Sequence, residues 1–247
     1  MDRDGKGQTM EGFLALGFLV GMSHALEADH LAAIGAMAAG KTNGRRRLVI
    51  RGAAWGIGHS ITLLAICALV LLFGFALTAP RAAAMEFSVG VMLVLLGLSV
   101  FWRLWRRRVH FHRHSHGGRP HIHVHSHAGA TLPHATDPHH HRHPEGPPVT
   151  ALLVGLVHGA AGSAGLLTLA VATSRNPATA LGYVALFGLG SIAGMALLSF
   201  AASWPLGLAD RGILWLHRGI AAAAGAGAIV IGADVMFATG ALAWTNF

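Results

Sequence analysis

The chain has 247 residues, of which 53% are hydrophobic and 11% are charged, with a formal net charge of +8 and a mean hydropathy of +0.55. Because soluble domains carry about 25% charged residues, this composition excludes an ordinary water-soluble globule and predicts a polytopic helical membrane protein. The single cysteine, Cys67, excludes an intramolecular disulfide and any thiol relay that needs two cysteines.

Six apolar runs are long enough to cross a bilayer, which takes about 20 helical residues. They cover residues 12–40, 53–79, 87–105, 149–173, 178–204 and 213–246. We therefore predict an all-α polytopic membrane protein with six transmembrane helices. Its parts are a first three-helix unit at residues 1–105, a polar loop at 106–148 and a second three-helix unit at 149–247.

The first run extends well beyond a signal-peptide core, so we expect it to be retained as a span. It holds His24, Glu27, Asp29 and His30 among apolar residues. A charge at the bilayer centre costs about 2.5–3.5 kcal/mol, so these side chains need partners or a function. Imidazole and carboxylate together suit borderline divalent ions such as Ni²⁺, Co²⁺ and Zn²⁺.

A straight helix would place His24, Glu27 and His30 along one stripe, whereas Asp29 would lie about 140° from His24. Asp29 would then orient an imidazole without touching the ion, or it would join the ligands where the helix is unwound. Both readings stay open at this point.

The second run adds Gly56, Gly58, His59 and Ser60. Glycines permit close helix approach, and His59 would present a further nitrogen toward the first helix. The alternative is that His59 only forms a hydrogen bond between helices. We expect His59 to be an ion ligand and keep Ser60 as a candidate that supports the ligands.

The loop at 106–148 is rich in Arg, Pro, Gly and His without an apolar period, which predicts a disordered segment. Alternating histidines in a flexible chain can capture and buffer a borderline cation. The predicted metal-buffering histidines are His112, His114, His116, His121, His123, His125, His127, His139, His140 and His141. Deleting this loop is expected to alter affinity or regulation without abolishing transport.

The second half repeats features of the first. Gly21-Met-Ser-His24 recurs as Gly155-Leu-Val-His158, and Trp55-Gly56-Ile-Gly58 as Phe187-Gly188-Leu-Gly190. Three helices per half invert the second copy, as in many secondary transporters. We therefore predict two inverted three-helix repeats facing one central site. The candidates that this half adds are His158 and Ser163 on the fourth run and Asp234 on the sixth, with interhelical hydrogen bonding or an interfacial position as the alternatives.

The positive charge is concentrated on one side of the predicted topology. Of the 18 lysines and arginines, fourteen lie in or beside the first connection, the long loop and the fifth connection. The positive-inside rule then places the histidine-rich loop in the cytoplasm and both termini outside. The net charge is accounted for by topology, so we expect a lipid bilayer and no nucleic acid as partner.

The segment from His24 to His30 resembles the signature of the nickel/cobalt transporter family, a histidine, four residues and then Asp-His in an early membrane helix. Gly58-His59-Ser60 is similar to the family's second signature. The resemblance implies an inner-membrane permease for Ni²⁺ or Co²⁺ with His24, Asp29, His30 and His59 as ligands, and Glu27 stands where the family also has an acid. The later acidic signatures are not recognisable, so the chain looks closer to the smaller urease- or hydrogenase-accessory branch or to exporters with a histidine-rich loop.

We therefore predict secondary transport of a divalent transition metal, with the ion as substrate, no permanently bound cofactor and no enzymatic activity. Uptake and export both stay open, as do a homo-oligomer or a metallochaperone as partner. The alternative is a membrane metal sensor or accessory protein for metalloenzyme maturation without transport of its own. An intramembrane serine protease using Ser163 is disfavoured, because it would leave the acids and histidines of the first run without a role.

Overall fold

The computed structural model describes residues 3–39, 44–106, 109–116, 119–126, 148–162, 165–166, 176–209 and 214–243. Its helices are α1 (Arg3–His24), α2 (Ala28–Ala38), α3 (Arg45–Phe73), α4 (Ala79–Arg106), α5 (Val149–His158), α7 (Pro177–Ala209) and α8 (Leu214–Ala243), and its strands are β1 (Val109–His116) and β2 (Arg119–Ser126). Within the described residues, α3, α4, α7 and α8 are long and apolar enough to cross a membrane. The chain is a multi-pass membrane protein.

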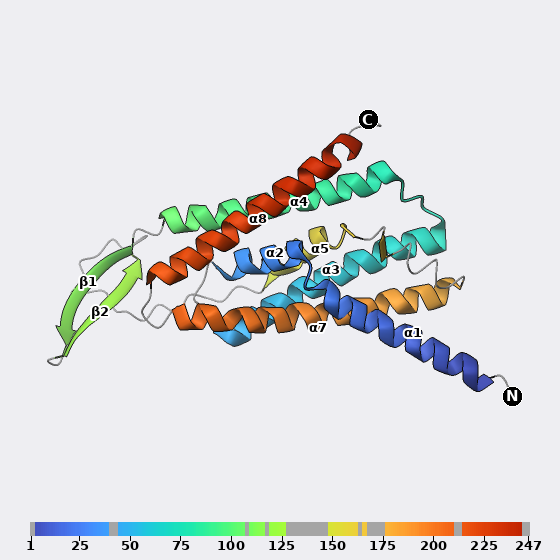
Figure 1. Cartoon of the computed structure of the whole chain (residues 1–247), viewed down its shortest axis with the longest axis horizontal. Coiled ribbons are helices and arrows are strands. Elements are labelled where there is room, and N and C mark those ends of the chain that lie inside the picture. Colours follow the sequence, from blue (N-terminus) through green and yellow to red (C-terminus); the bar gives the residue numbers. More distant parts are fainter. Residues whose placement is uncertain are drawn as a thin grey trace.

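The long helices form two packed pairs, α3 with α7 and α4 with α8 (Figure 1). The short helices α2 and α5 lie between these pairs, α2 against α8 and α5 against α3. Helix α1 packs on α7, and its N-terminal end projects from the bundle (Figure 1). The middle of the bundle is therefore built from helix ends rather than from continuous helices.

Glycines allow the closest helix contacts. An added Cβ at Gly21 would overlap the carbonyl of Phe187, and one at Gly155 would overlap the carbonyl of Trp55. Because each glycine meets rigid backbone, these crossings tolerate no larger side chain. The two contacts join α1 to α7 and α5 to α3, and they use the residues that the sequence comparison paired between the halves.

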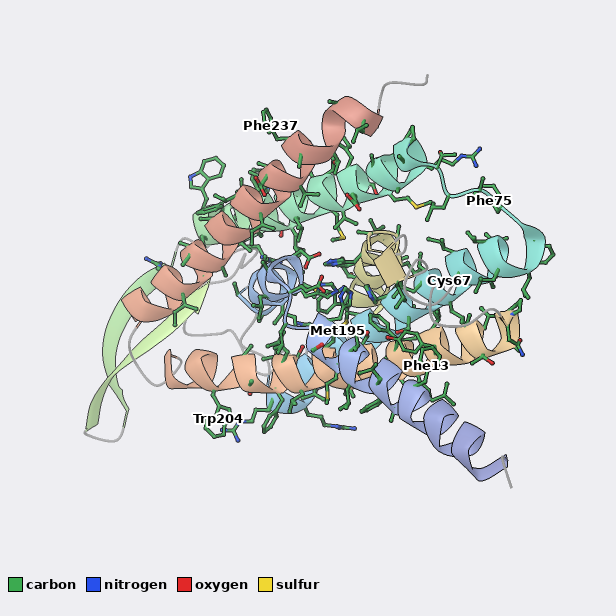
Figure 2. All side chains as sticks on the ribbon, turned by 45° about the vertical axis from the view of Figure 1, so that its right-hand side comes forward. Phe13, Cys67, Phe75, Met195, Trp204 and Phe237 are labelled. Atoms are coloured by element: carbon green, nitrogen blue, oxygen red, sulfur yellow. The ribbon has the colours of Figure 1, made fainter. Side chains whose placement is uncertain are left out.

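Helices α4 and α8 meet in the same way. Gly90 faces the carbonyl of Gly232, and Gly232 faces the carbonyl of Gly90. About two helical turns after Gly90, Gly97 packs on the carbonyl of Gly225. The outward side chains of the bundle are apolar, and Phe237 and Trp204, labelled in Figure 2, are 90% and 59% exposed. Such a surface suits lipid rather than water.

The apolar run over 12–40 forms two helices rather than one straight helix. Helix α1 ends at His24, the backbone turns through Leu26, and α2 begins after Glu27, whose backbone is extended. The N–H groups of Leu26 and Glu27 donate to the carbonyls of Ser23 and His24, which satisfies the backbone within the turn. Asp29 accepts the backbone N–H of His30 at 2.8 Å and so stabilises the first turn of α2.

The predicted helix over 149–173 is also interrupted. Helix α5 ends at His158, and the chain turns through Gly162, which has a φ of +74° that favours glycine. Only Gly165 and Leu166 are helical among the described residues that follow within this run. The two interruptions thus fall at the two histidines that the repeat pairs, His24 and His158.

The loop is not wholly irregular, because residues 109–116 and 119–126 form strands where the sequence predicts a disordered segment. Strands β1 and β2 form an antiparallel hairpin that projects from one end of the bundle (Figure 1). The alternating histidines have the period of a β-strand, in which every second position shares a face. His127, His139, His140 and His141 lie outside the described residues.

Candidate metal-ion site

The helix break brings the ionisable residues of the first run together. His24 is the last residue of α1, Glu27 caps α2 at its N-terminus, and Asp29 and His30 lie in the first turn of α2. Because the chain changes direction between them, these side chains are not constrained to one helical stripe. The helix is therefore unwound at the point that the second reading of Asp29 requires, and Asp29 contacts the imidazoles of His30 and His158.

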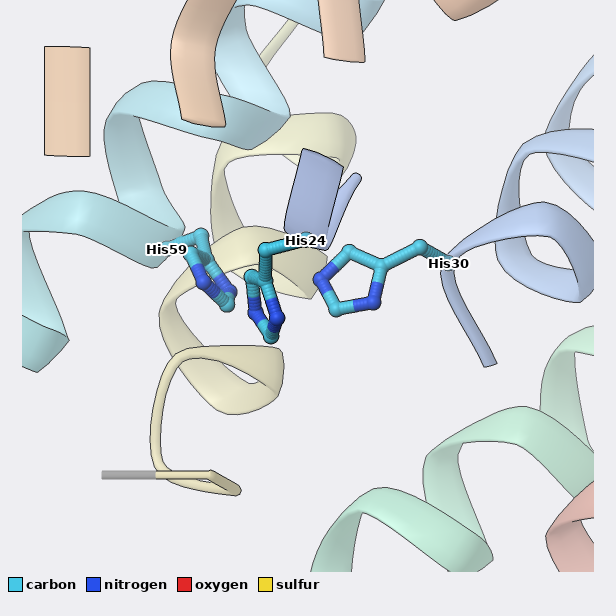
Figure 3. A group of neighbouring side chains, drawn as sticks. All are labelled: His24, His30 and His59. Atoms are coloured by element: carbon cyan, nitrogen blue, oxygen red, sulfur yellow. The ribbon is translucent and has the colours of Figure 1, made fainter. Parts of the chain in front are cut away.

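Three imidazole rings meet beside this break. The ring centroids of His24 and His30 are 4.5 Å apart, and His59 of α3 lies 5.3 Å from the first and 5.2 Å from the second (Figure 3). One potential ligand atom from each residue falls within 4.8 Å of the others. His30 and His59 are buried, and His24 is partly buried. We refer to His24, His30 and His59 as the three-histidine group.

The acids contact these imidazoles from outside the group. Glu27 Oε1 lies 2.7 Å from Nδ1 of His24, and Asp29 Oδ1 lies 2.8 Å from Nδ1 of His30. A carboxylate can only accept, so each Nδ1 carries the proton and donates it. In a neutral ring the lone pair then resides on Nε2, which is the nitrogen available to an ion.

Asp29 also reaches the second half of the chain. Its Oδ2 lies 3.0 Å from Nε2 of His158, the buried last residue of α5. The rings of His30 and His158 have centroids 4.2 Å apart. Asp29, His30 and His158 form a second cluster whose potential ligand atoms lie within 4.8 Å of one another. We refer to it as the aspartate group.

Four buried imidazole nitrogens at this centre have no hydrogen-bond partner within the described part of the chain. They are Nε2 of His30, both ring nitrogens of His59 and Nδ1 of His158. Leaving a buried polar atom unpaired costs about 1–3 kcal/mol, so such a concentration requires a function. Neutral imidazole nitrogens are preferred ligands of Ni²⁺, Co²⁺ and Zn²⁺.

The other predicted candidates lie apart from this centre. Ser60 donates to the carbonyl of Gly188 at 2.9 Å and joins α3 to α7. Asp234 is exposed on α8 and belongs to neither group. Ser163 lies outside the described residues.

Trp55 was missed by the sequence prediction. It is fully buried one turn before His59, and its ring centroid lies 5.3 Å from His30 and 5.4 Å from His158. The sequence held a signal for Trp55, because it lies four residues before His59 and so shares one face of the helix with it. Trp55 packs against both groups and restricts the positions of their rings.

The chain is 30% identical over 227 residues to the urease accessory protein UreH of Bacillus sp. (strain TB-90). The alignment covers 92% of this chain and 91% of UreH, so both halves take part in the similarity. No family model and no solved structure matches the chain. Of the signature residues of the first run, His24 and His30 form the three-histidine group with His59, and Asp29 belongs to the aspartate group. The chain belongs to the nickel/cobalt transporter family.

Proposed function

We propose that this protein is a secondary transporter that carries Ni²⁺ or Co²⁺ across the cell inner membrane. The observation that carries the proposal is the three-histidine group, in which imidazoles from three helices converge. Nε2 of His30 and both ring nitrogens of His59 are buried there without a hydrogen-bond partner among the described residues. An ion that sheds most of its water would find nitrogen ligands from His24, His30 and His59. Ni²⁺ and Co²⁺ accept such donors readily.

The acids give the site charge without occupying its ligand positions. Asp29 and Glu27 accept hydrogen bonds from the imidazoles and leave the opposite nitrogens as lone-pair donors. Carboxylates behind a histidine ligand raise its basicity and fix its orientation. They also offset the charge of a divalent ion in surroundings where a bare dication would be very costly.

The packing supports two inverted repeats as the moving parts. Gly21 on Phe187 corresponds to Gly155 on Trp55, and the break after His24 corresponds to the break after His158. In inverted-repeat transporters, sites form where helices are interrupted at the repeat interface, and the halves rock around them. Rocking would open the histidine groups first to one side and then to the other.

The histidine-rich loop is proposed to concentrate the ion at the cytoplasmic face. The backbone register of the hairpin sets His110 opposite His125, His112 opposite His123 and His114 opposite His121. Facing positions in an antiparallel pair share one face of the ribbon. This arrangement supports paired histidine positions, a more defined geometry than a flexible buffer.

Ion flux into liposomes that contain the purified protein tests the proposal. We expect His59→Ala to lower Ni²⁺ flux at least about tenfold, because the ion loses a ligand for which the site holds no substitute. Cys67→Ala is the matched control, since Cys67 is buried on the same helix two turns further on and belongs to neither group. Equal flux in His59→Ala and in the unmodified protein would refute the site.

The similarity to a urease accessory protein favours one other candidate, an accessory protein for metalloenzyme maturation without transport of its own. The same liposomes separate the two functions. A protein that only senses or delivers the ion would bind Ni²⁺ and give no flux above that of empty liposomes. The sign of nickel accumulation in cells with and without the protein then distinguishes uptake from export.

A further inference from the structure

We propose that the aspartate group is a second divalent-cation site, and that the ion passes between it and the three-histidine group through their shared residue, His30. This inference rests on the proposed transport function and adds a path to it. The sequence suggested His158 only as a ligand of the second half or a supporting residue. The structure gives it a specific place beside Asp29 and His30.

The aspartate group has the ingredients of an ion site of its own. His158 is 1% exposed, and its Nδ1 has no hydrogen-bond partner within the described residues. Asp29 stands between His30 and His158, with one carboxylate oxygen within 3.0 Å of a nitrogen of each. Two imidazoles and a carboxylate form a familiar ligand set for borderline divalent ions.

The two groups differ in origin and in ligand type. The three-histidine group comes from α1, α2 and α3, all in the first half, and offers only nitrogen. The aspartate group adds α5 from the second half and replaces one nitrogen with a carboxylate oxygen. A step from one to the other would therefore carry the ion from the first half to the interface between the halves.

His30 allows one ion at a time. Its Nδ1 is the nitrogen beside Asp29, and its Nε2 is buried without a partner. A neutral imidazole has one lone pair and one N–H, so it serves one group at a time. An ion in the aspartate group would replace the two hydrogen bonds of Asp29. The proton of His30 would then lie on Nε2 instead of Nδ1 and that of His158 on Nδ1 instead of Nε2, so each neutral ring would turn its lone pair toward the ion.

Electrostatic repulsion between two bound ions also limits the two groups to one ion at a time. Two dications held on the two nitrogens of one ring would lie a few ångströms apart, where like charges repel strongly. Occupation of one site thus empties the other. This exclusion suits transport, because an ion that binds tightly in a single site would not leave it.

The test compares binding with flux in the full-length protein. We expect His158→Ala to keep the tight Ni²⁺-binding step that His59→Ala removes in calorimetry, with affinity reduced less than about threefold, and to lose at least tenfold in liposome flux. His59→Ala, by contrast, should lose both tight binding and flux. Cys67→Ala again serves as the control for a buried substitution outside both groups.

A second variant separates a ligand from a residue that merely orients Asp29. His158→Gln keeps an N–H donor for Asp29 but supplies a poor ligand for Ni²⁺, so we expect it to remain as slow as His158→Ala. Recovery of flux in His158→Gln would overturn the second site, and so would unchanged flux in His158→Ala. Equal losses of affinity in His158→Ala and His59→Ala would also overturn it, because they would indicate a single site.

These outcomes are distinct from failure of the proposed function. If His59→Ala transports normally, the transport site itself is wrong. If His59→Ala loses flux while His158→Ala does not, only the second site is wrong.

Discussion

Asp29 has the most connected position of any side chain at this centre. It accepts the backbone N–H of His30 and the ring N–H groups of His30 and His158. It therefore stabilises the start of α2, orients one histidine from each half and supplies negative charge. Among the described residues the Glu27 carboxylate pairs with His24, and it is 58% exposed, so its surroundings screen its charge more than that of Asp29.

Asp29→Asn should lower Ni²⁺ affinity by about 10–100-fold, the loss seen when the carboxylate behind a histidine ligand is removed. The amide has a similar shape but carries no charge and accepts through one oxygen only. Glu27→Gln is the matched substitution and should have a smaller effect, because its contact is exposed. Calorimetry on the purified proteins measures both, and equal affinities for Asp29→Asn and the unmodified chain would contradict the role given to Asp29.

Gly155 is the residue where packing and the site are most directly linked. An added Cβ would overlap the carbonyl of Trp55 and approach the backbone of His59. Gly155→Ala should therefore lower the melting temperature by several degrees and weaken Ni²⁺ binding, since overpacking costs about 1–3 kcal/mol and here displaces a ligand helix.

Gly227→Ala provides the control, because nothing lies within 4 Å of a Cβ added there. It should leave Ni²⁺ affinity unchanged and the melting temperature equal or slightly higher, since alanine favours helix more than glycine. Scanning fluorimetry in detergent measures the melting temperatures. A stable Gly155→Ala protein with normal affinity would show that this helix crossing does not position His59.

At the scale of elements, the long helices were the most predictable from sequence. The apolar run at 178–204 corresponds to α7 (Pro177–Ala209), and the run at 213–246 corresponds to α8 (Leu214–Ala243). The break after His24 was less accessible, because residues 25–27 contain neither glycine nor proline to mark a helix end. Asp29 beside the break contacts His158 of the second half, and a single chain segment does not reveal that contact.

The candidate ligands were predictable for a different reason. Buried histidines and acids stand out in an apolar run, so His24, Asp29, His30 and His59 could be chosen from residue type alone. The contacts among these residues could not be predicted, because a straight helix would turn Asp29 away from His24. The pairing of Asp29 with His158 depends on both helix breaks and on the packing of α5 against α3.

The hairpin permits a test in which composition stays constant. Exchanging His112 with Arg113 and His123 with Val124 keeps every histidine but moves two of them off the shared face. If the backbone register organises ion binding, the exchanged protein should bind loop-associated Ni²⁺ several-fold more weakly. The His59→Ala background removes the contribution of the three-histidine group, and calorimetry gives the affinity. Equal binding by both arrangements would favour a flexible buffer.

At the scale of the whole molecule, the proposed topology predicts on which side of the membrane the hairpin and the N-terminus lie. The excess of arginine around the loop predicts that the hairpin lies in the cytoplasm. Ser126→Cys, in a Cys67→Ala background, should react with a membrane-impermeant maleimide only after the cytoplasmic face is opened. Labelling in intact cells would reverse the orientation. A cysteine in place of Arg3 should show the opposite pattern, because the N-terminus is expected outside.

The two interrupted helices also have an electrostatic consequence. Helices α1 and α5 both end at a histidine of the centre, so each directs the negative end of its dipole toward it. A helix end carries about half an elementary charge, from carbonyl groups that no longer find partners within the helix. Two such ends favour a cation without adding an acid to the membrane. The opposing positive end belongs to α2, and Asp29 in its first turn counters it.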